Sequence, residues 1–159
     1  MSVKTILLVE DNPSDIELTR RALLKSRVAD KLVVVEDGQE ALDYLFGSAT
    51  YAGRDASALP GLTLLDLNLP KVSGLNVLRA IRNDPRTRRL PVVILTTSNE
   101  ERDLAMGYDL GANSYIRKPV DFAQFAEAIR HLELYWLRLN ETPPPGENGV
   151  KVTPFPEPL

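Results

Sequence analysis

The chain has no cysteine and only one histidine among its 159 residues. The absence of cysteine excludes a disulfide scaffold, thiol catalysis and zinc sites with sulfur ligands. His131 cannot by itself build a metal site that needs several histidine ligands. No four-helix dimerisation pattern surrounds His131, so we expect a solvated helix residue rather than a phosphorelay histidine.

Long apolar runs are also missing. None approaches the length that a transmembrane helix needs, and the N-terminus shows no charged region followed by an apolar stretch. With 19 basic and 22 acidic residues, the net charge of -3 argues against a nucleic-acid binder. We therefore expect a soluble cytoplasmic protein that binds neither membranes nor nucleic acid.

Short apolar runs alternate with helix signals along the chain. The runs at 6–9, 32–35, 62–65, 92–95 and 114–117 are typical of buried strands. Helices are predicted at 13–26, 39–46, 73–83, 100–109 and after Asp121. Asn12 and Asp121 are the predicted caps of the first and last helix, and Asp15 is the acid three residues after Asn12. This alternation predicts an α/β fold with a five-stranded parallel sheet covered on both faces, in the doubly wound, flavodoxin-like order 2-1-3-4-5.

Two segments differ from this pattern. Residues 47–61 are rich in Gly, Ala and Ser and predict an irregular connection. Residues 141–159 hold half of the 12 prolines, a composition that disfavours helices and central strands. We expect one domain over 1–140 and a flexible Pro-rich tail over 141–159.

Charged and hydroxyl side chains stand at four of the predicted strand ends. Glu10 and Asp11 follow the first strand, Asp66 the third and Lys118 the fifth, while Thr96 ends the fourth. Parallel strands bring their carboxyl ends to one edge of the sheet, where ligands bind. Each residue alone is compatible with a solvated strand end. Together they predict a site for a hard cation and a phosphoryl group.

Four motifs in this order resemble the CheY-like receiver domain of two-component response regulators. They are Val-Glu-Asp-Asn-Pro (9–13), Leu-Leu-Asp-Leu-Asn-Leu-Pro-Lys-Val-Ser-Gly (64–74), Leu-Thr-Thr-Ser (95–98) and Tyr-Ile-Arg-Lys-Pro (115–119). The resemblance extends over nearly all of the chain before the tail and includes every functional position.

The resemblance implies that Asp66 is the phosphoacceptor for a phosphoryl group from a sensor histidine kinase. It implies that Mg²⁺ binds Asp11, Asp66 and the backbone carbonyl of Asn68, with Glu10 acting directly or through water. Glu10 stands where many relatives have Asp. The side chain of Asn68 lies where relatives tune dephosphorylation, so the resemblance does not predict the phosphoryl lifetime.

The remaining motif residues also acquire roles from the resemblance. Thr96 and Lys118 would bind phosphoryl oxygens, and Tyr115 would be the switch aromatic that responds to Thr96. Pro119 would follow a cis peptide bond. Gly74 would allow a tight turn after the Asp66 loop.

Residues 47–61 and 133–137 resemble the single-domain regulators that pair with phytochrome-type kinases. The last helix carries an apolar seam with alternating spacings of 3 and 4, whose first half is expected to pack on the sheet. The second half predicts a symmetric homodimer, together with the edge of the fifth strand. The predicted interface residues are Leu132, Tyr135, Trp136 and Leu139.

Several functions stay open at this point. The leading hypothesis is a stand-alone receiver that accepts phosphate and is not an enzyme with external substrates; a phosphorelay intermediate is a variant of it. An aspartate-nucleophile phosphatase of the haloacid dehalogenase type would need an acid where Asn68 stands, and usually a cap domain. A receiver that only binds partners is the third alternative, and the complete acidic set argues against it.

Overall fold

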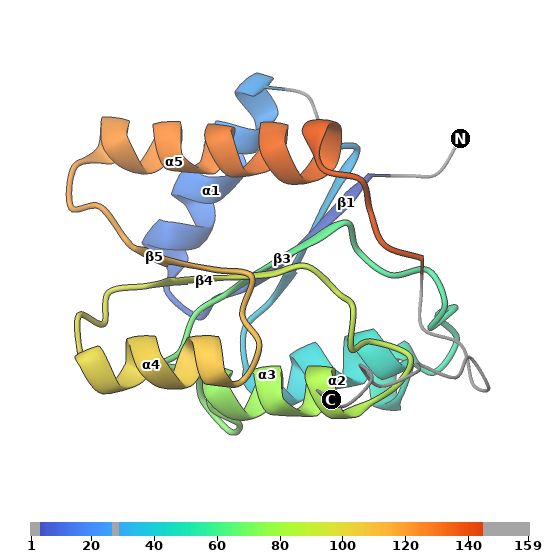
Figure 1. Ribbon diagram of the computed structural model, residues 1–159. Coiled ribbons are helices and arrows are strands. Elements are labelled where there is room, and N and C mark those ends of the chain that lie inside the picture. The colour runs from blue at the N-terminus through green and yellow to red at the C-terminus, as the bar shows by residue number, and fades with distance from the viewer. Residues whose placement is uncertain (1–3, 27–28, 145–159) are drawn as a thin grey trace, which may run out of the picture.

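The computed structural model of the chain describes residues 4–26 and 29–144. Five parallel strands form one sheet in the order β2-β1-β3-β4-β5, which confirms the predicted flavodoxin-like topology (Figure 1). The strands are β1 (Thr5–Val9), β2 (Lys31–Val35), β3 (Leu62–Leu65), β4 (Val92–Thr96) and β5 (Ser114–Arg117).

Helices cover both faces of the sheet (Figure 1). On one face lie α1 (Pro13–Ser26) and α5 (Phe122–Leu134); on the other lie α2 (Gly38–Phe46), α3 (Gly74–Asn83) and α4 (Glu101–Asp109). A 3-10 turn, η1 (Ala49–Tyr51), follows α2, and a π-helical turn, η2 (Tyr135–Leu139), continues α5. Among the described residues, no helix is both long and apolar enough to cross a membrane.

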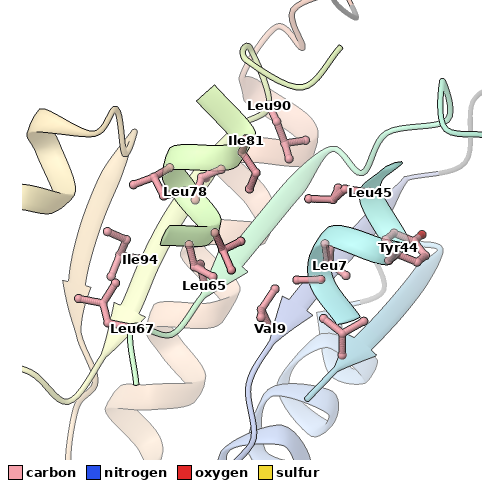
Figure 2. Close-up of a cluster of buried hydrophobic side chains, with 14 residues drawn as sticks. Leu7, Val9, Tyr44, Leu45, Leu65, Leu67, Leu78, Ile81, Leu90 and Ile94 are labelled. Atoms are coloured by element: carbon pink, nitrogen blue, oxygen red, sulfur yellow. The ribbon is translucent and has the colours of Figure 1, made fainter. Parts of the chain in front are cut away.

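The central strands are apolar throughout because both of their faces are covered. Alternate residues of β1 enter two separate cores: Leu7 and Val9 pack under α2 and α3, while Ile6 and Leu8 pack under α1 and α5. Figure 2 shows the first of these cores, in which Leu7 and Val9 lie among side chains from the neighbouring elements. The sheet is therefore anchored from both sides, and its strand ends are held in a fixed relation.

Helices begin at capping side chains that follow the strands. Asn12 Oδ1 accepts from the backbone N–H groups of Ser14 (2.9 Å) and Asp15 (3.1 Å). The side chain of Asp121 likewise accepts from Gln124 N–H at 3.0 Å. Both predicted caps are therefore confirmed, and both lie at the carboxyl edge of the sheet, where they shape the functional surface.

The apolar seam of α5 faces the sheet only in its middle. Phe125, Ile129 and Leu132 are buried in the core under α1 and α5, whereas Phe122 is 54% exposed. The prediction that Leu132 belongs to an exposed dimer surface is therefore wrong, because packing against the sheet covers it. His131 is exposed on the opposite side of α5, as expected, with Nε2 3.0 Å from Glu127.

The π-helical turn η2 changes which residues of the last helix face outward. A π turn holds more residues than an α turn, so the seam of α5 does not continue through it. Leu137 becomes buried, and Trp136 packs partly against the same core. Tyr135 and Leu139 remain exposed, at 50% and 74%. Only these two of the four predicted interface residues are fully available to a partner.

The connection over 47–61 folds back onto α2 instead of extending into solvent. The Arg54 guanidinium lies 4.0 Å from the Tyr44 ring centroid and donates to the Tyr44 carbonyl at 2.8 Å. The Tyr51 hydroxyl donates to Glu40 at 2.9 Å. Farther along, Thr142, Pro143 and Pro144 line a pocket of about 120 Å³ together with residues of 57–60 and 86–91. The rest of the predicted tail, 145–159, lies outside the described residues.

Candidate functional site

Three carboxylates converge where β1 and β3 end. These strands are neighbours in register, with Val9 opposite Leu65, so the residues that follow them meet at the edge of the sheet. Glu10, Asp11 and Asp66 each place a carboxylate oxygen within 4.8 Å of the others. Glu10 and Asp66 are buried and Asp11 is exposed, which leaves the cluster open to solvent on one side.

Lys118 points into this cluster. Its Nζ lies 2.7 Å from Glu10 Oε2, 2.8 Å from Asp15 Oδ2 and 3.3 Å from Asp66 Oδ2, and its side chain is only 5% exposed. An ammonium has three hydrogens to donate, and here three carboxylates receive them. Lys118 is therefore a buried part of the site and not a surface lysine.

Asp15 is a site residue that the sequence did not reveal. Asp15 lies in the first turn of α1, where an acid is already expected as a helix-start signal. The sequence therefore offers no reason to expect its contact with a lysine 103 positions away. Nothing in the local pattern distinguishes an acid that faces its own helix end from one that faces another element.

Burial and neighbouring charges shift the pKa values of two groups in the cluster, Glu10 and Lys118. Burial raises the pKa of the Glu10 carboxyl to about 7, the negative charge of Asp66 acts in the same direction, and the hydrogen bond from Lys118 only partly opposes them. Burial lowers the pKa of Lys118, but its bonds to Asp15 and Glu10 and the charge of Asp66 outweigh that effect and raise it. Lys118 therefore stays charged, while an excess of carboxylates favours a proton on Glu10.

The Asp66 carboxylate is oriented by the backbone and by Lys118. Its Oδ1 accepts from Leu67 N–H at 2.7 Å and, more weakly, from Asn68 N–H at 3.4 Å. Its Oδ2 accepts from Lys118 Nζ at 3.3 Å. The Asn68 residue itself is exposed at the rim of the site. Asp66 is thus held in one orientation, with both oxygens on polar partners.

Thr96 and Tyr115 meet the same residue of the loop between β4 and α4. Thr96 is buried at the end of β4, and its Oγ1 accepts from Ser98 N–H at 3.4 Å. The Tyr115 hydroxyl donates to the Ser98 carbonyl at 3.3 Å, and Ser98 Oγ donates to Asp103 at 2.6 Å. Ser98 therefore links the two predicted switch residues.

The peptide bond before Pro119 is trans, as are all peptide bonds among the described residues. The predicted cis bond is wrong for this structure. The two isomers of an X–Pro bond differ little in free energy, so the surrounding fold decides between them and the Lys-Pro pair alone cannot.

Gly74 is required for a different reason than the predicted tight turn. A Cβ at this position would lie 2.1 Å from the Asp66 carbonyl oxygen and 2.6 Å from Leu67 Cα. A Cβ at Gly38 would similarly lie 1.9 Å from the Val72 carbonyl oxygen. Both helix starts therefore press directly against the loop that follows Asp66, and only glycine permits this approach.

Comparisons with known proteins agree with this geometry. Residues 6–130 match the family model described as the response regulator receiver domain. The chain is 38% identical over 134 residues to response regulator Rcp1 of Synechocystis sp., a match that covers 84% of this chain and 89% of that protein. It is 41% identical over 140 residues to the probable methanogenesis regulatory protein FilR2 of Methanothrix harundinacea, covering 88% of each.

Two solved structures share the fold over most of the chain. The phosphorylated cyanobacterial phytochrome response regulator RcpA superposes with a TM-score of 0.83 at 43% identity, covering 89% of this chain and 99% of that one. The Mn²⁺-bound form of Rcp1 superposes with a TM-score of 0.82 at 36% identity, covering 88% and 99%. On the strength of the family match, the strand order and these relatives, the chain belongs to the response regulator receiver domain family.

Proposed function

We propose that the protein is a cytoplasmic, single-domain response regulator that accepts a phosphoryl group on Asp66 from a sensor histidine kinase. The observation that carries the proposal is the arrangement of Asp66, whose Oδ1 is held by Leu67 N–H while Oδ2 faces Lys118. A carboxylate in such a position can attack phosphorus, and the adjacent ammonium can neutralise charge on the transferred group.

The donor set fits Mg²⁺. Glu10, Asp11 and Asp66 offer hard oxygen ligands within 4.8 Å of one another, and Mg²⁺ prefers carboxylates and water. These three side chains would hold the ion, with the Asn68 carbonyl as the further ligand that the resemblance implies. When bound, Mg²⁺ supplies positive charge that offsets the developing charge on the phosphoryl oxygens. The Mn²⁺-bound state in which Rcp1 was solved supports a divalent ion in such a cluster.

The transfer itself would use the protein's own side chains. A carboxylate oxygen of Asp66 forms a bond to phosphorus while the bond between phosphorus and the donor histidine nitrogen breaks, and the histidine keeps that electron pair. Lys118 donates to one phosphoryl oxygen, and Thr96 donates its hydroxyl to another.

The switch would operate through Ser98. When Thr96 turns its hydroxyl to a phosphoryl oxygen, the 3.4 Å contact with Ser98 N–H is given up. Movement of Ser98 then removes the acceptor of the Tyr115 hydroxyl. Phosphorylation would in this way bias an existing equilibrium between two arrangements of the loop between β4 and α4.

The partner kinase is proposed to be of the phytochrome type, because RcpA, at 43% identity, is a phytochrome response regulator. We also propose a homodimer through exposed Tyr135 and Leu139, with Trp136 at the margin. Sedimentation of the wild type and of a Tyr135→Ser, Leu139→Ser variant tests the dimer. A monomer at micromolar concentration for both proteins would contradict it.

The test of phosphorylation is intact mass after incubation with acetyl phosphate and Mg²⁺. We expect one phosphoryl adduct on the wild type and on the matched surface variant Asp55→Asn. The adduct should be absent from Asp66→Asn and absent in EDTA. No adduct on the wild type would instead favour a protein that only binds partners, and turnover of a small phosphoester would favour a phosphatase.

A further inference from the structure

Asp15 makes one of the two short contacts of Lys118. Its Oδ2 lies 2.8 Å from Lys118 Nζ, almost as close as Glu10 Oε2 at 2.7 Å, whereas Asp66 Oδ2 is 3.3 Å away. The ammonium is therefore held more closely by Glu10 and Asp15 than by the proposed phosphoacceptor. Asp15 is not one of the three carboxylates of the candidate metal cluster.

The carboxylate of Asp15 does not make the helix-capping hydrogen bond that is usual for an acid at its position. An acid three residues after a helix cap commonly accepts from the backbone N–H of the cap. Here Asn12 N–H donates instead to Glu10 Oε1 at 3.1 Å. The backbone of Asp15 is still anchored, by its N–H to Asn12 Oδ1 and by its carbonyl, which accepts from Thr19 Oγ1 at 2.8 Å.

We propose that Asp15 is a positioning residue that competes with the phosphoryl group for Lys118. The inference rests on the proposed function and adds a determinant of how strongly Asp66 holds the phosphoryl group. All three hydrogens of the Lys118 ammonium face carboxylates, so a phosphoryl oxygen obtains one of them only by displacing an acceptor.

Of the two close acceptors of Lys118, Asp15 loses less than Glu10 when the ammonium turns away. Its side chain is 22% exposed, against 3% for Glu10, so water can solvate the Asp15 carboxylate when Lys118 turns away. Releasing Lys118 from Glu10 would instead leave a buried carboxyl group without this hydrogen bond, which costs more. The bond between Asp15 and Lys118 thus stabilises the unphosphorylated arrangement.

The test uses beryllofluoride, an analogue of the phosphoryl group, with the full chain in Mg²⁺. Asp15→Asn keeps the size of the side chain and removes its charge, so Lys118 becomes available. We expect Asp15→Asn to bind beryllofluoride roughly tenfold more tightly than the wild type, since a charge-assisted hydrogen bond no longer competes. Asp15→Ala should change the affinity in the same direction.

Glu17→Gln is the matched control. It removes the same charge from the same helix, but Glu17 is 53% exposed and pairs with Arg21 at 3.0 Å. We expect its beryllofluoride affinity to equal that of the wild type. A change as large as that of Asp15→Asn would show a general charge effect and overturn the inference.

Titration with Mn²⁺ alone separates competition from structural support. Loss of a negative charge near the cluster should weaken Mn²⁺ binding in Asp15→Asn while beryllofluoride binding becomes tighter. Weaker binding of both Mn²⁺ and beryllofluoride by Asp15→Asn would mean that Asp15 supports the site. A beryllofluoride affinity equal to that of the wild type would mean that Asp15 does not compete for Lys118. Either result overturns this inference and leaves the proposed function standing. A wild type that binds no beryllofluoride would remove the proposed function as well.

Discussion

Two cationic side chains tie the strand ends of this protein together at opposite edges of the sheet, and they do so with opposite kinds of partner. At the carboxyl edge, Lys118 donates to the carboxylates of Glu10, Asp15 and Asp66. At the amino edge, Arg82 donates to neutral oxygens only.

The partners of Arg82 come from two connections, the one between α3 and β4 and the one between α4 and β5. Its guanidinium donates to the carbonyls of Gly111 (2.8 Å), Arg88 (2.9 Å) and Leu90 (2.7 Å) and to the side-chain oxygen of Asn113 (2.9 Å). Burial without an anionic partner lowers the pKa of Arg82, whereas that of Lys118 is raised. Because the guanidinium has a fixed fork of donors, it suits the fixed carbonyls of a structural junction.

The difference shows what separates a cation at a structural junction from a cation in the candidate site. The neutral acceptors around Arg82 add no negative charge, so this part of the amino edge has little tendency to bind a cation. The carboxylates around Lys118 exceed its single charge, so the carboxyl edge favours protons or a divalent cation. Excess negative charge, not burial, distinguishes the candidate site at the carboxyl edge from the junction at the amino edge.

The largest effect should follow removal of Arg82. Arg82→Met loses four hydrogen bonds and leaves their acceptors unpaired, so we expect the free energy of unfolding to fall by about 3–5 kcal/mol. The loss should be the same at pH 5 and pH 8, because the acceptors do not titrate. Urea denaturation of the metal-free protein at both pH values measures it.

Lys118→Met is the counterpart of this experiment. Without the ammonium, Glu10 loses the hydrogen bond and the positive charge that lower its pKa, so the folded state holds the Glu10 proton to a higher pH than the unfolded state does. Stability should therefore fall further at pH 8 than at pH 5. If both variants lose the same stability at both pH values, the contrast between the two edges is not electrostatic.

A smaller effect is expected where glycine meets the Asp66 loop. Gly74→Ala places a methyl group 2.1 Å from the Asp66 carbonyl, so the loop must shift, at a cost of about 3 kcal/mol. Gly53→Ala is the control, because a Cβ at that position would have open space for 4 Å around it, and it should change stability by less than about 0.5 kcal/mol. Thermal denaturation compares the two; equal melting temperatures would contradict the close approach.

An effect of comparable size concerns the proton on Glu10. The folded state holds this proton up to about pH 7, whereas the unfolded chain releases it near the ordinary value of 4.5. At about 1.4 kcal/mol per pKa unit, the metal-free wild type should therefore lose about 3 kcal/mol of stability as the pH rises between these values. Glu10→Gln should lack this decline. Urea denaturation measures the free energy of unfolding of both proteins across this pH range. The same dependence on pH in both would rule out a raised pKa for Glu10.

Much of the site could be predicted because it depends on strand ends. Apolar runs mark where Glu10, Asp66 and Lys118 must emerge, and parallel pairing brings those positions to one edge. Arg82 could not be found in the same way. It lies within a helix, and its acceptors are mostly backbone carbonyls, which no sequence pattern distinguishes.

The amino-acid sequence was enough to predict the elements, their order, the helix caps at Asn12 and Asp121 and the edge at which the charges gather. These features follow from local periodicity and from the few topologies open to alternating strands and helices. The contact of Asp15 with Lys118, and the burial of Leu132 beside an exposed Tyr135, became evident only in the packed molecule. Each of these depends on which groups from distant parts of the chain compete for the same hydrogen bond or the same core volume, and such competition is settled only when those parts are packed together.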